Sequence, residues 1–479
     1  MVSLKKAGIF LFIGFFFFIN NHLIDGPDIY TPIIDGRLMI QQGTPDIKVP
    51  TFLSEENAVN YRWLFEYSFF KIHETFGNQG LIILQNAVYM LLFLTIFYFI
   101  NSMTGNFGIS IFYAVFPVLS YMLFCGELRP QLVSLFLFSL VFVIFKQVSA
   151  KRLNKKLLFF IPLVIAVWAN IHVTFLIGLL LIFFEAFTHP EDKKFALLLV
   201  LSGAASFLTP HGYMAYLPVF DYLKSRPIYG TISELQPLIK SFPMFVIFVL
   251  VTALNLVTIS KTGISDKESL PEFFLVIIFF FKTIFCMKFL IYYVLVSSFI
   301  AGSSGRKNFE KKSYSVILFF LCVVALGLIA GPASPVRKSY LDSESLTDIF
   351  DFLEKSGVKG VIYTPDVAVN NYVSYRFYPD IIPLVNGLTN AHSDEAYSLW
   401  DRWDRSEKAF KSISECNICL YKWKDYKKNY RQLSFSNWWI WYYNEEWLLC
   451  GREKLSPDNP RVSQIGYYDQ ALNRGVPGL

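Results

Sequence analysis

Charged residues are scarce in this chain. Only 17% of its 479 residues are charged, whereas 54% are hydrophobic and the mean hydropathy is +0.42. This balance excludes an ordinary soluble protein and is typical of an integral membrane protein. The net charge of +6 does not indicate nucleic-acid binding, because the lysines gather in short loops between apolar runs. Basic loops of this kind mark the cytoplasmic side of a membrane protein.

A signal-peptide cleavage site is also missing. Lys5 and Lys6 precede an apolar run of about spanning length that ends at Leu23. No small-residue cleavage site follows this run. We therefore expect an uncleaved signal anchor with its N-terminus in the cytoplasm.

Cysteines are few and internal repeats are absent. The pair Cys416 and Cys419 has the spacing of metal ligands, but no second ligand pair lies nearby in the sequence. A zinc site is therefore disfavoured, and a disulfide to Cys450 is the better alternative. Without a two-fold repeat, a transporter is disfavoured as well.

Long apolar runs rich in phenylalanine make up most of the chain. The 50 phenylalanines are expected to form lipid-facing bulk. Basic clusters separate the runs, the strongest of them at Lys146–Lys156. We expect single spans near residues 8–24, 81–101, 107–125, 131–146 and 314–331.

Two topologies fit the basic clusters. If residues 157–187 and 272–303 are each a pair of short helices, the chain has about eleven spans; if each is one long helix, it has about nine. Both topologies place the C-terminus outside the cytoplasm. We favour eleven, because half-spanning helices break in lipid only where they line a cavity. Eleven spans also place three polar segments on the same face as the loop at 25–80, namely Trp168–His172, Thr209–Gly212 and Glu234.

Two segments lie outside the predicted spans. The loop at 25–80 is too long for a simple connection and is expected to be functional, with an amphipathic surface helix over Glu55–Phe76. Residues 333–479 are expected to form a soluble α/β domain, and residues 1–332 with their loop the transmembrane domain. In the soluble part, the pattern predicts a helix at Ser345–Ser356 and strands at 360–363, 418–423 and 447–450.

Polar and aromatic residues stand at the ends of several apolar runs. Examples are Arg62-Trp63-Leu64, Trp168-Ala-Asn-Ile-His172 and Thr209-Pro-His-Gly212. Such groups are costly near hydrocarbon and usually face a cavity or a substrate path. They indicate a polar pocket on one side of the bilayer.

An ordered series of motifs carries a family resemblance. The first loop holds Asp28-Ile-Tyr, Asp35-Gly-Arg-Leu with Gly43 after it, Asp46 and Arg62-Trp-Leu64. Their order resembles the first extracytoplasmic loop of bacterial membrane proteins of the glycosyltransferase C (GT-C) superfold, the group similar to protein mannosyltransferases and family 39 glycosyltransferases. Later motifs continue the resemblance: Leu128-Arg-Pro-Gln131, Trp168–His172, Thr209–Gly212, Ile232–Pro237, and Asp366, Asn371 and Tyr378-Pro379.

Two motifs depart from the family pattern. The aromatic pair and histidine that often follow the first aspartate are replaced by Tyr30-Thr-Pro, and the Asp-Gly-Arg of the soluble domain has become Asn386-Gly-Leu388. These departures affect the expected catalysis more than the expected fold.

The resemblance implies a bacterial inner-membrane protein with a GT-C-like transmembrane domain and an extracytoplasmic α/β domain. It implies transfer of a sugar from a polyprenyl-phosphate donor to an extracytoplasmic glycan, lipid or protein acceptor. Asp28 aligns with the general base, although Asp25, Asp35 and Asp46 remain alternatives. The phosphate leaving group needs a cation or a divalent metal to stabilise it. The candidate substrate-binding residues are Asp46, Arg62, Arg129, Asn170, His172, His211 and Glu234, with Lys288 as a third candidate cation.

Each of these interpretations has a structural alternative. His172 can equally be a helix-end histidine that hydrogen-bonds within the chain, Glu127 can simply pair with Arg129, and Lys288 can extend to the membrane interface. The tryptophans of the soluble domain can stack on sugars or fill its core. The alternative for the whole protein is a catalytically inactive GT-C-like scaffold that binds a glycan or a partner protein.

Overall fold

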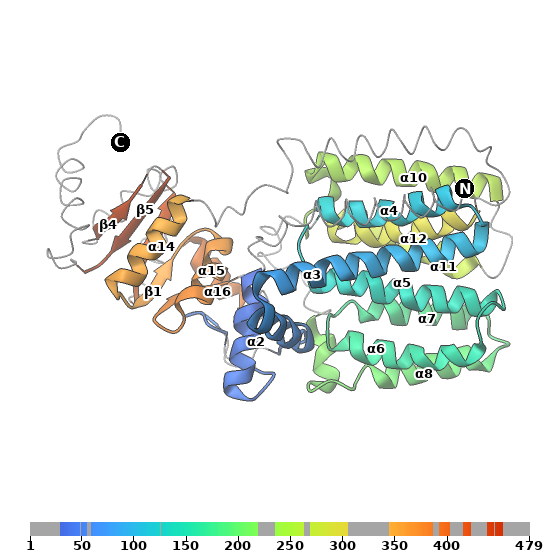
Figure 1. Ribbon diagram of the computed structural model, residues 1–479, viewed down its shortest axis with the longest axis horizontal. Coiled ribbons are helices and arrows are strands. Elements are labelled where there is room, and N and C mark those ends of the chain that lie inside the picture. Colours follow the sequence, from blue (N-terminus) through green and yellow to red (C-terminus); the bar gives the residue numbers. More distant parts are fainter. Residues whose placement is uncertain are drawn as a thin grey trace. The chain divides into compact units, whose positions relative to one another are not determined.

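The chain forms two compact units, shown in a computed structural model (Figure 1). The helical unit contains Tyr61–Arg337 together with Met1–Ile24, and the sheet unit contains Lys338–Leu479 together with Asp25–Asn60. The structure describes residues 29–47, 49–54, 59–124, 126–218, 235–262, 269–304, 344–386, 392–402, 415–422, 438–444 and 446–453. The predicted spans at 8–24 and 314–331 lie outside these residues.

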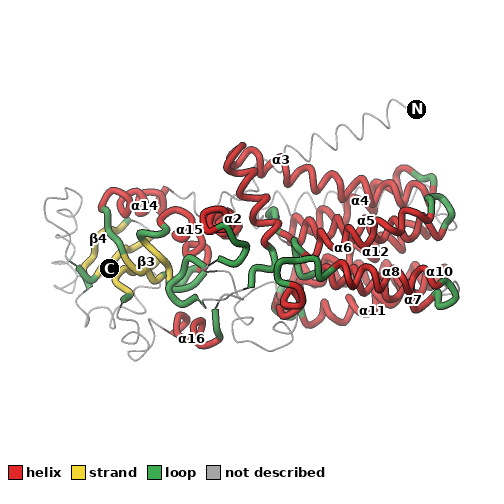
Figure 2. The backbone as a smooth tube through the Cα atoms, turned by 90° about the horizontal axis from the view of Figure 1, so that it is seen from below, coloured by secondary structure: helices red, strands yellow, loops and turns green. Residues whose placement is uncertain are grey.

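Helices dominate the described chain, and strands occur only in the sheet unit (Figure 2). By length and composition, three of the described helices could cross a membrane: Trp63–Thr104, Pro130–Ser149 and Phe242–Ser260. Large apolar side chains such as Leu163, Val200, Phe242 and Phe285 are more than half exposed. Apolar surface of this kind suits contact with lipid better than contact with water.

The first long helix joins two predicted elements. Helix α3, Trp63–Thr104, has a non-helical residue at Gly77, where φ is 60° and ψ is −157°. The part before this kink corresponds to the predicted surface helix, although it begins at Trp63 rather than at Glu55. The part after it corresponds to the predicted span, and α4 (Phe107–Phe124) and α5 (Pro130–Ser149) follow as expected.

Both long apolar stretches are split into pairs of helices, as predicted. The first is divided into a 3-10 turn at Lys155–Phe160, α6 (Ile161–Ala169) and α7 (Phe175–Thr188). The second is divided into α11 (Leu270–Phe285), a 3-10 turn at Met287–Phe289, and α12 (Leu290–Ser304). The other described helices of this unit are α8 (Lys193–Ala205) and α10 (Phe242–Thr262), with 3-10 turns at Gly212–Tyr216 and Leu238–Lys240.

Successive helices of this unit run back and forth, so their connections gather at two ends. At one end, the backbone N–H of Met287 donates to Gln236 O (3.0 Å), and Asn170 Nδ2 donates to Leu208 O (2.9 Å). We call this the polar end. At the other, basic end, Gln147 and Arg152 both hydrogen-bond to Ser102. Lys146 departs from prediction, because it lies buried inside α5 rather than in a basic loop.

The sheet unit contains a five-stranded mixed sheet in the order β2-β1-β3-β5-β4. Strands β1 (Gly360–Tyr363), β2 (Ile381–Pro383) and β3 (Cys416–Lys422) are parallel, whereas β5 (Trp447–Gly451) is antiparallel to β3 and to β4 (Trp439–Tyr443). Helices α15 (Val367–Phe377) and α16 (Asp394–Arg402) lie between the parallel strands in the sequence. The predicted helix is α14, Glu344–Ser356.

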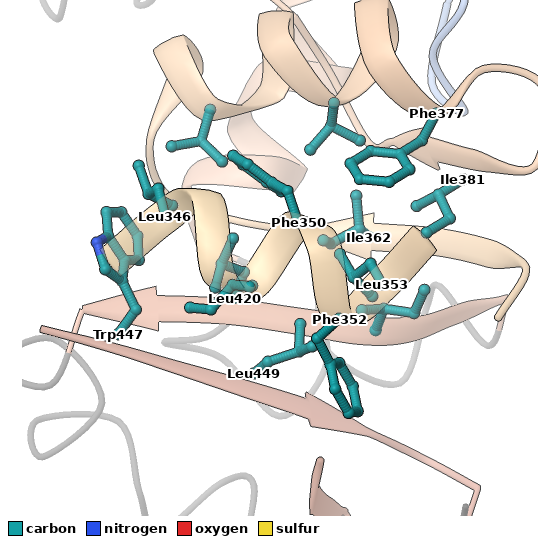
Figure 3. Close-up of a cluster of buried hydrophobic side chains, with 14 of the residues drawn as sticks. Leu346, Phe350, Phe352, Leu353, Ile362, Phe377, Ile381, Leu420, Trp447 and Leu449 are labelled. Atoms are coloured by element: carbon teal, nitrogen blue, oxygen red, sulfur yellow. The ribbon is translucent and has the colours of Figure 1, made fainter. Parts of the chain in front are cut away.

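An apolar core fixes α14 to the sheet (Figure 3). Phe350 and Leu353 of α14 meet Ile362, Leu420 and other strand residues in this cluster, where they are almost fully buried. Among the described tryptophans of this unit, Trp441 and Trp447 belong to this core, and Trp400 is buried elsewhere in the unit. This is the structural rather than the sugar-stacking interpretation.

Residues of the first loop form part of the sheet unit, which differs from the predicted domain division. Helix α2, Tyr30–Gln42, ends at Gly43 (φ 68°) and packs on α15. Beyond it, the backbone N–H groups of Phe52 and Leu53 donate to Pro383 O (2.9 Å) and Leu384 O (3.0 Å) at the end of β2. These contacts satisfy backbone groups at the sheet edge that would otherwise be exposed.

The three cysteines of the sheet unit are free thiols, contrary to the expected disulfide. Cys416, Cys419 and Cys450 are all buried. Cys419 stands directly opposite Cys450 in the β3–β5 ladder, so the predicted neighbours are correct although no bond joins them.

Candidate functional site at the polar end of the helical unit

Asn170 holds the polar end of the helical unit together. Its Oδ1 accepts a hydrogen bond of 2.6 Å from Trp63 Nε1, and its backbone carbonyl accepts one of 3.2 Å from the N–H of Leu64. Its Nδ2 donates to Ala166 O (2.8 Å) and to Leu208 O (2.9 Å). The two predicted motifs at Arg62–Leu64 and 168–172 are therefore in direct contact.

His172 lies buried in the turn between α6 and α7. Its Nδ1 is 2.6 Å from Thr174 Oγ1 and 3.3 Å from Ser134 Oγ, and Ser134 Oγ also accepts a hydrogen bond of 3.0 Å from Trp168 Nε1. Burial lowers the pKa of the His172 imidazole well below its ordinary value, and the positive charges of Lys288 and Arg62 lower it further. The imidazole is therefore neutral at physiological pH.

The described cationic side chains at this end include Arg62, Arg129 and Lys288. Arg62 Nη2 is 2.9 Å from Glu66 Oε1, and the Glu66 carboxylate is almost fully buried. Arg129 Nε is 3.3 Å from Glu127 Oε2, which confirms the expected pairing of these two residues. Lys288 lies in the 3-10 turn before α12, close enough to His172 to affect its charge.

The structure brings together four of the predicted residues: Arg62, Asn170, His172 and Lys288. Arg129 immediately precedes α5, one helical turn before Ser134, and so belongs to the same end. His211 follows Leu208 and precedes the 3-10 turn at Gly212–Tyr216.

Three other predicted residues lie in the sheet unit or outside the described residues. Asp46 lies exposed in the sheet unit, where its backbone N–H donates to Thr44 Oγ1 (3.2 Å). Asp28 and Glu234 lie outside the described residues. The proposed general base therefore has no described geometry.

Sequence analysis missed Ser134, Glu66 and the role of Trp63. Ser134 is one of the serines of the apolar helix α5. Such a hydroxyl ordinarily bonds to its own backbone, and Ser134 does donate to Pro130 O (2.9 Å). Its spacing from Pro130 gives no sign that it also meets Trp168 and His172. Glu66 carried a usable signal, because it stands four residues after Arg62 on the predicted helix.

This arrangement can bind an anion. The charges of Lys288 and Arg62 act on the neutral imidazole of His172, which forms hydrogen bonds of its own. Charge-assisted hydrogen bonds from such cations to an anion are among the strongest available. A phosphate group needs only such donors and no ionised base. Neither a protein-family model nor a curated protein matches the chain, so the family resemblance of its motifs remains a prediction.

Proposed function

We propose that the protein is a membrane glycosyltransferase that moves a sugar from a polyprenyl-phosphate donor to an extracytoplasmic acceptor. The observation that carries this proposal is the contact between the segment that follows Arg62 and the segment 168–172, at an end where the charges of Arg62 and Lys288 act on the neutral His172. Negative charge develops on the phosphate as the sugar leaves, and prearranged donors or cations stabilise that charge.

The roles of the site residues follow from their chemistry. Lys288, Arg62 and Arg129 would stabilise the phosphate, while His172 would orient it or the acceptor through a hydrogen bond. Asp28 would accept the proton of the acceptor hydroxyl as that oxygen attacks the anomeric carbon. Asp46, Glu234 and His211 would contact the substrates. A divalent metal remains an alternative source of positive charge.

The proposed placement in the cell follows from the same features. The polar end would face out of the cytoplasm of a bacterial inner membrane, and the basic end would face inward, as the positive-inside rule requires. The acceptor would then be an extracytoplasmic glycan, lipid or protein. The sheet unit would lie on the acceptor's side of the membrane.

Two observations favour the alternative of a catalytically inactive scaffold. Arg62 and Arg129 each have a glutamate partner within the chain, which offsets part of their charge. In addition, the Asn386 of the altered motif is buried, and its carbonyl accepts a hydrogen bond from Tyr397 Oη (3.0 Å). A scaffold would use the sheet unit to bind a glycan or a partner protein.

The deciding experiment is Asp28→Asn in the native host, with surface glycans profiled by mass spectrometry. If the protein transfers sugar, one glycan should be lost at a normal protein level, whereas the control Asp192→Asn should leave the profile unchanged. Asp192 suits this purpose because it caps α8 at the basic end, and asparagine caps helices equally well.

A scaffold gives a different set of results. Asp28→Asn would then be tolerated, whereas removal of residues 333–479 would give the same glycan change as deletion of the whole gene. An unchanged profile in Asp28→Asn beside a changed one in the deletion would contradict the role of Asp28 as base.

A further inference from the structure

A buried cluster of ionisable side chains lies near the basic end of the helical unit. Lys146 Nζ of α5 is 3.0 Å from Glu185 Oε1 of α7 and 2.8 Å from Glu272 Oε1 of α11. The three side chains are 8%, 0% and 11% exposed. One ammonium group therefore links two glutamates on different helices. Lys146 lies about 24 Å along α5 from the polar end at Pro130, so the cluster is separate from the candidate site.

The charges of this cluster do not balance. Two carboxylates face one ammonium group, which leaves one negative charge if all three are ionised. The surroundings are apolar, with Lys146 Nζ 6.0 Å from the centre of the Phe142 ring. An uncompensated charge is strongly disfavoured in such surroundings. Binding of one proton makes the cluster neutral, because it leaves one carboxylic acid beside one ion pair.

The surroundings of the two carboxylates indicate where the proton binds. Both oxygens of Glu185 and the Oε2 atom of Glu272 are buried and have no hydrogen-bond partner among the described residues. Each oxygen of Glu185 nevertheless faces a basic group, since Oε1 is 3.0 Å from Lys146 Nζ and Oε2 is 3.8 Å from His189 Nδ1, whereas the described ion pair of Glu272 involves only its Oε1 atom. Ionised oxygens without partners are unfavourable inside a protein, whereas a protonated one carries no charge. A metal ion is a poor alternative, because it would have to sit beside the ammonium group of Lys146.

Other titratable groups occur at the end of α7 and the start of α8. His189 Nδ1, at the end of α7, is 3.8 Å from Glu185 Oε2, and its side chain is 17% exposed. The first turn of α8 adds Lys193 and Lys194, which are both exposed. His189 is therefore the group through which a proton can pass between the cluster and water.

We propose that Lys146, Glu185 and Glu272 form a proton-binding site that holds one exchangeable proton on Glu272. In the loaded state, the Glu272 carboxylate and the proton form a carboxylic acid, and Lys146 pairs with Glu185. In the unloaded state, the cluster carries one net negative charge, and the two carboxylates of α7 and α11 repel each other. Ionisable residues inside membrane helices commonly serve such roles. The site operates whether or not the polar end transfers sugar.

Thermal unfolding of the full-length protein in detergent micelles tests this site over a range of pH. The folded protein keeps a proton that the unfolded chain releases, since an exposed glutamate titrates near ~4.3. The Tm of the wild-type protein should therefore fall as pH rises through the titration of the site. Glu272→Gln should remove that fall, because the amide is neutral at every pH. Glu74→Gln is the matched control, since Glu74 forms an exposed pair with Lys71 (2.7 Å).

Infrared spectroscopy gives a second, direct readout. Wild-type protein should show the C=O band of a buried protonated carboxylic acid at neutral pH, and Glu272→Gln should lack it. The absence of this band from the wild-type protein would overturn the proposal, even if the variant does not fold. A second result would also overturn the proposal. If the Tm of His189→Gln no longer depends on pH and the wild-type protein shows no carboxylic acid band, the proton is held by the imidazole of His189.

Discussion

At the scale of single residues, the polar end contains a histidine that the fold keeps uncharged. The unfolded chain protonates its histidines below about pH 6.5, whereas folded His172 remains neutral well below that pH because its pKa is lowered. The unfolded state therefore binds an extra proton at acid pH, and stability should fall as pH falls below about 6.5.

His172→Gln should weaken this acid sensitivity, because glutamine can hydrogen-bond with Ser134 and Thr174 but does not titrate. The measurement is Tm against pH for the two purified proteins. Above about pH 7 the two curves should run parallel, since imidazole is neutral there in both states. Equal loss of Tm at acid pH in both proteins would contradict the assigned environment of His172.

Asn170 is the residue whose loss should most disturb this end. Asn170→Ala removes the acceptor of Trp63 Nε1 and the donor to Leu208 O, which breaks two partly buried hydrogen bonds. Each such hydrogen bond contributes about 0.5–1.5 kcal/mol to stability. A lowered Tm is expected, whereas Asn154→Ala should cost less, because Asn154 only caps an exposed 3-10 turn. Equal Tm losses in the two variants would contradict the central role of Asn170.

At the scale of elements, the close packing of α6 against α7 depends on a glycine. A Cβ at Gly178 would lie 2.7 Å from Trp168 Cζ3 and 2.9 Å from Ile165 Cδ1, whereas a Cβ at Gly203 in α8 would meet nothing within 4 Å. Gly178→Ala should therefore destabilise the protein by about 1–3 kcal/mol. Gly203→Ala should be neutral or stabilising by up to about 1 kcal/mol. The Tm of the two variants separates the effect of packing from that of helix propensity. Equal changes in Tm would contradict the close packing of α6 against α7 at Gly178.

The apolar helices of the helical unit were predictable, because the length of an apolar run is enough to indicate such a helix. The division of residues 157–187 and 272–303 into helix pairs was also predicted, because that topology placed the basic clusters together on one side of the membrane. The short strand β2 was missed because three residues give no recognisable alternation. Helix α15 was missed because its buried face carries polar residues, including Asn370, Asn371 and Ser374. In the candidate site, the order of the motifs predicted Arg62, Asn170 and His172 but not Ser134. The proton-binding cluster was not predicted either. The contacts of Ser134 and of the cluster join helices that are far apart in the sequence.

The packing of α2 on the sheet unit can be tested with fragments. Residues 338–479 expressed alone should aggregate, because they lack α2, which packs on α15, and the segment at Phe52–Leu53, which hydrogen-bonds at the end of β2. Co-expression with residues 25–60 should recover soluble protein, since Thr51 Oγ1 then meets His392 Nε2 (2.9 Å) and Ser374 Oγ donates to Pro50 O (3.2 Å). Thr51→Val in the second fragment should reduce the recovered yield. Full solubility of residues 338–479 alone would contradict this dependence.

At the scale of the whole molecule, the two ends of the helical unit should lie on opposite sides of a membrane. Lys240 of the polar end and Lys155 of the basic end are both exposed. An impermeant maleimide added to right-side-out vesicles should label Lys240→Cys but not Lys155→Cys. Permeabilised vesicles should label both, with the unsubstituted chain as the background. Labelling of Lys155→Cys in sealed vesicles would contradict this orientation.

The two-part origin of the sheet unit has a consequence for synthesis. About 290 residues separate Ser54 from the start of α14 at Glu344. At a translation rate of roughly 5–20 residues per second, the first part waits about 15–60 s for its partner. During that interval α2 and its neighbours lack α15 and β2, on which they pack in the folded protein. We therefore expect a chaperone to bind this segment until the sheet unit is complete. A ribosome that stalls inside the helical unit leaves this segment uncovered permanently, which marks the incomplete chain for proteolysis.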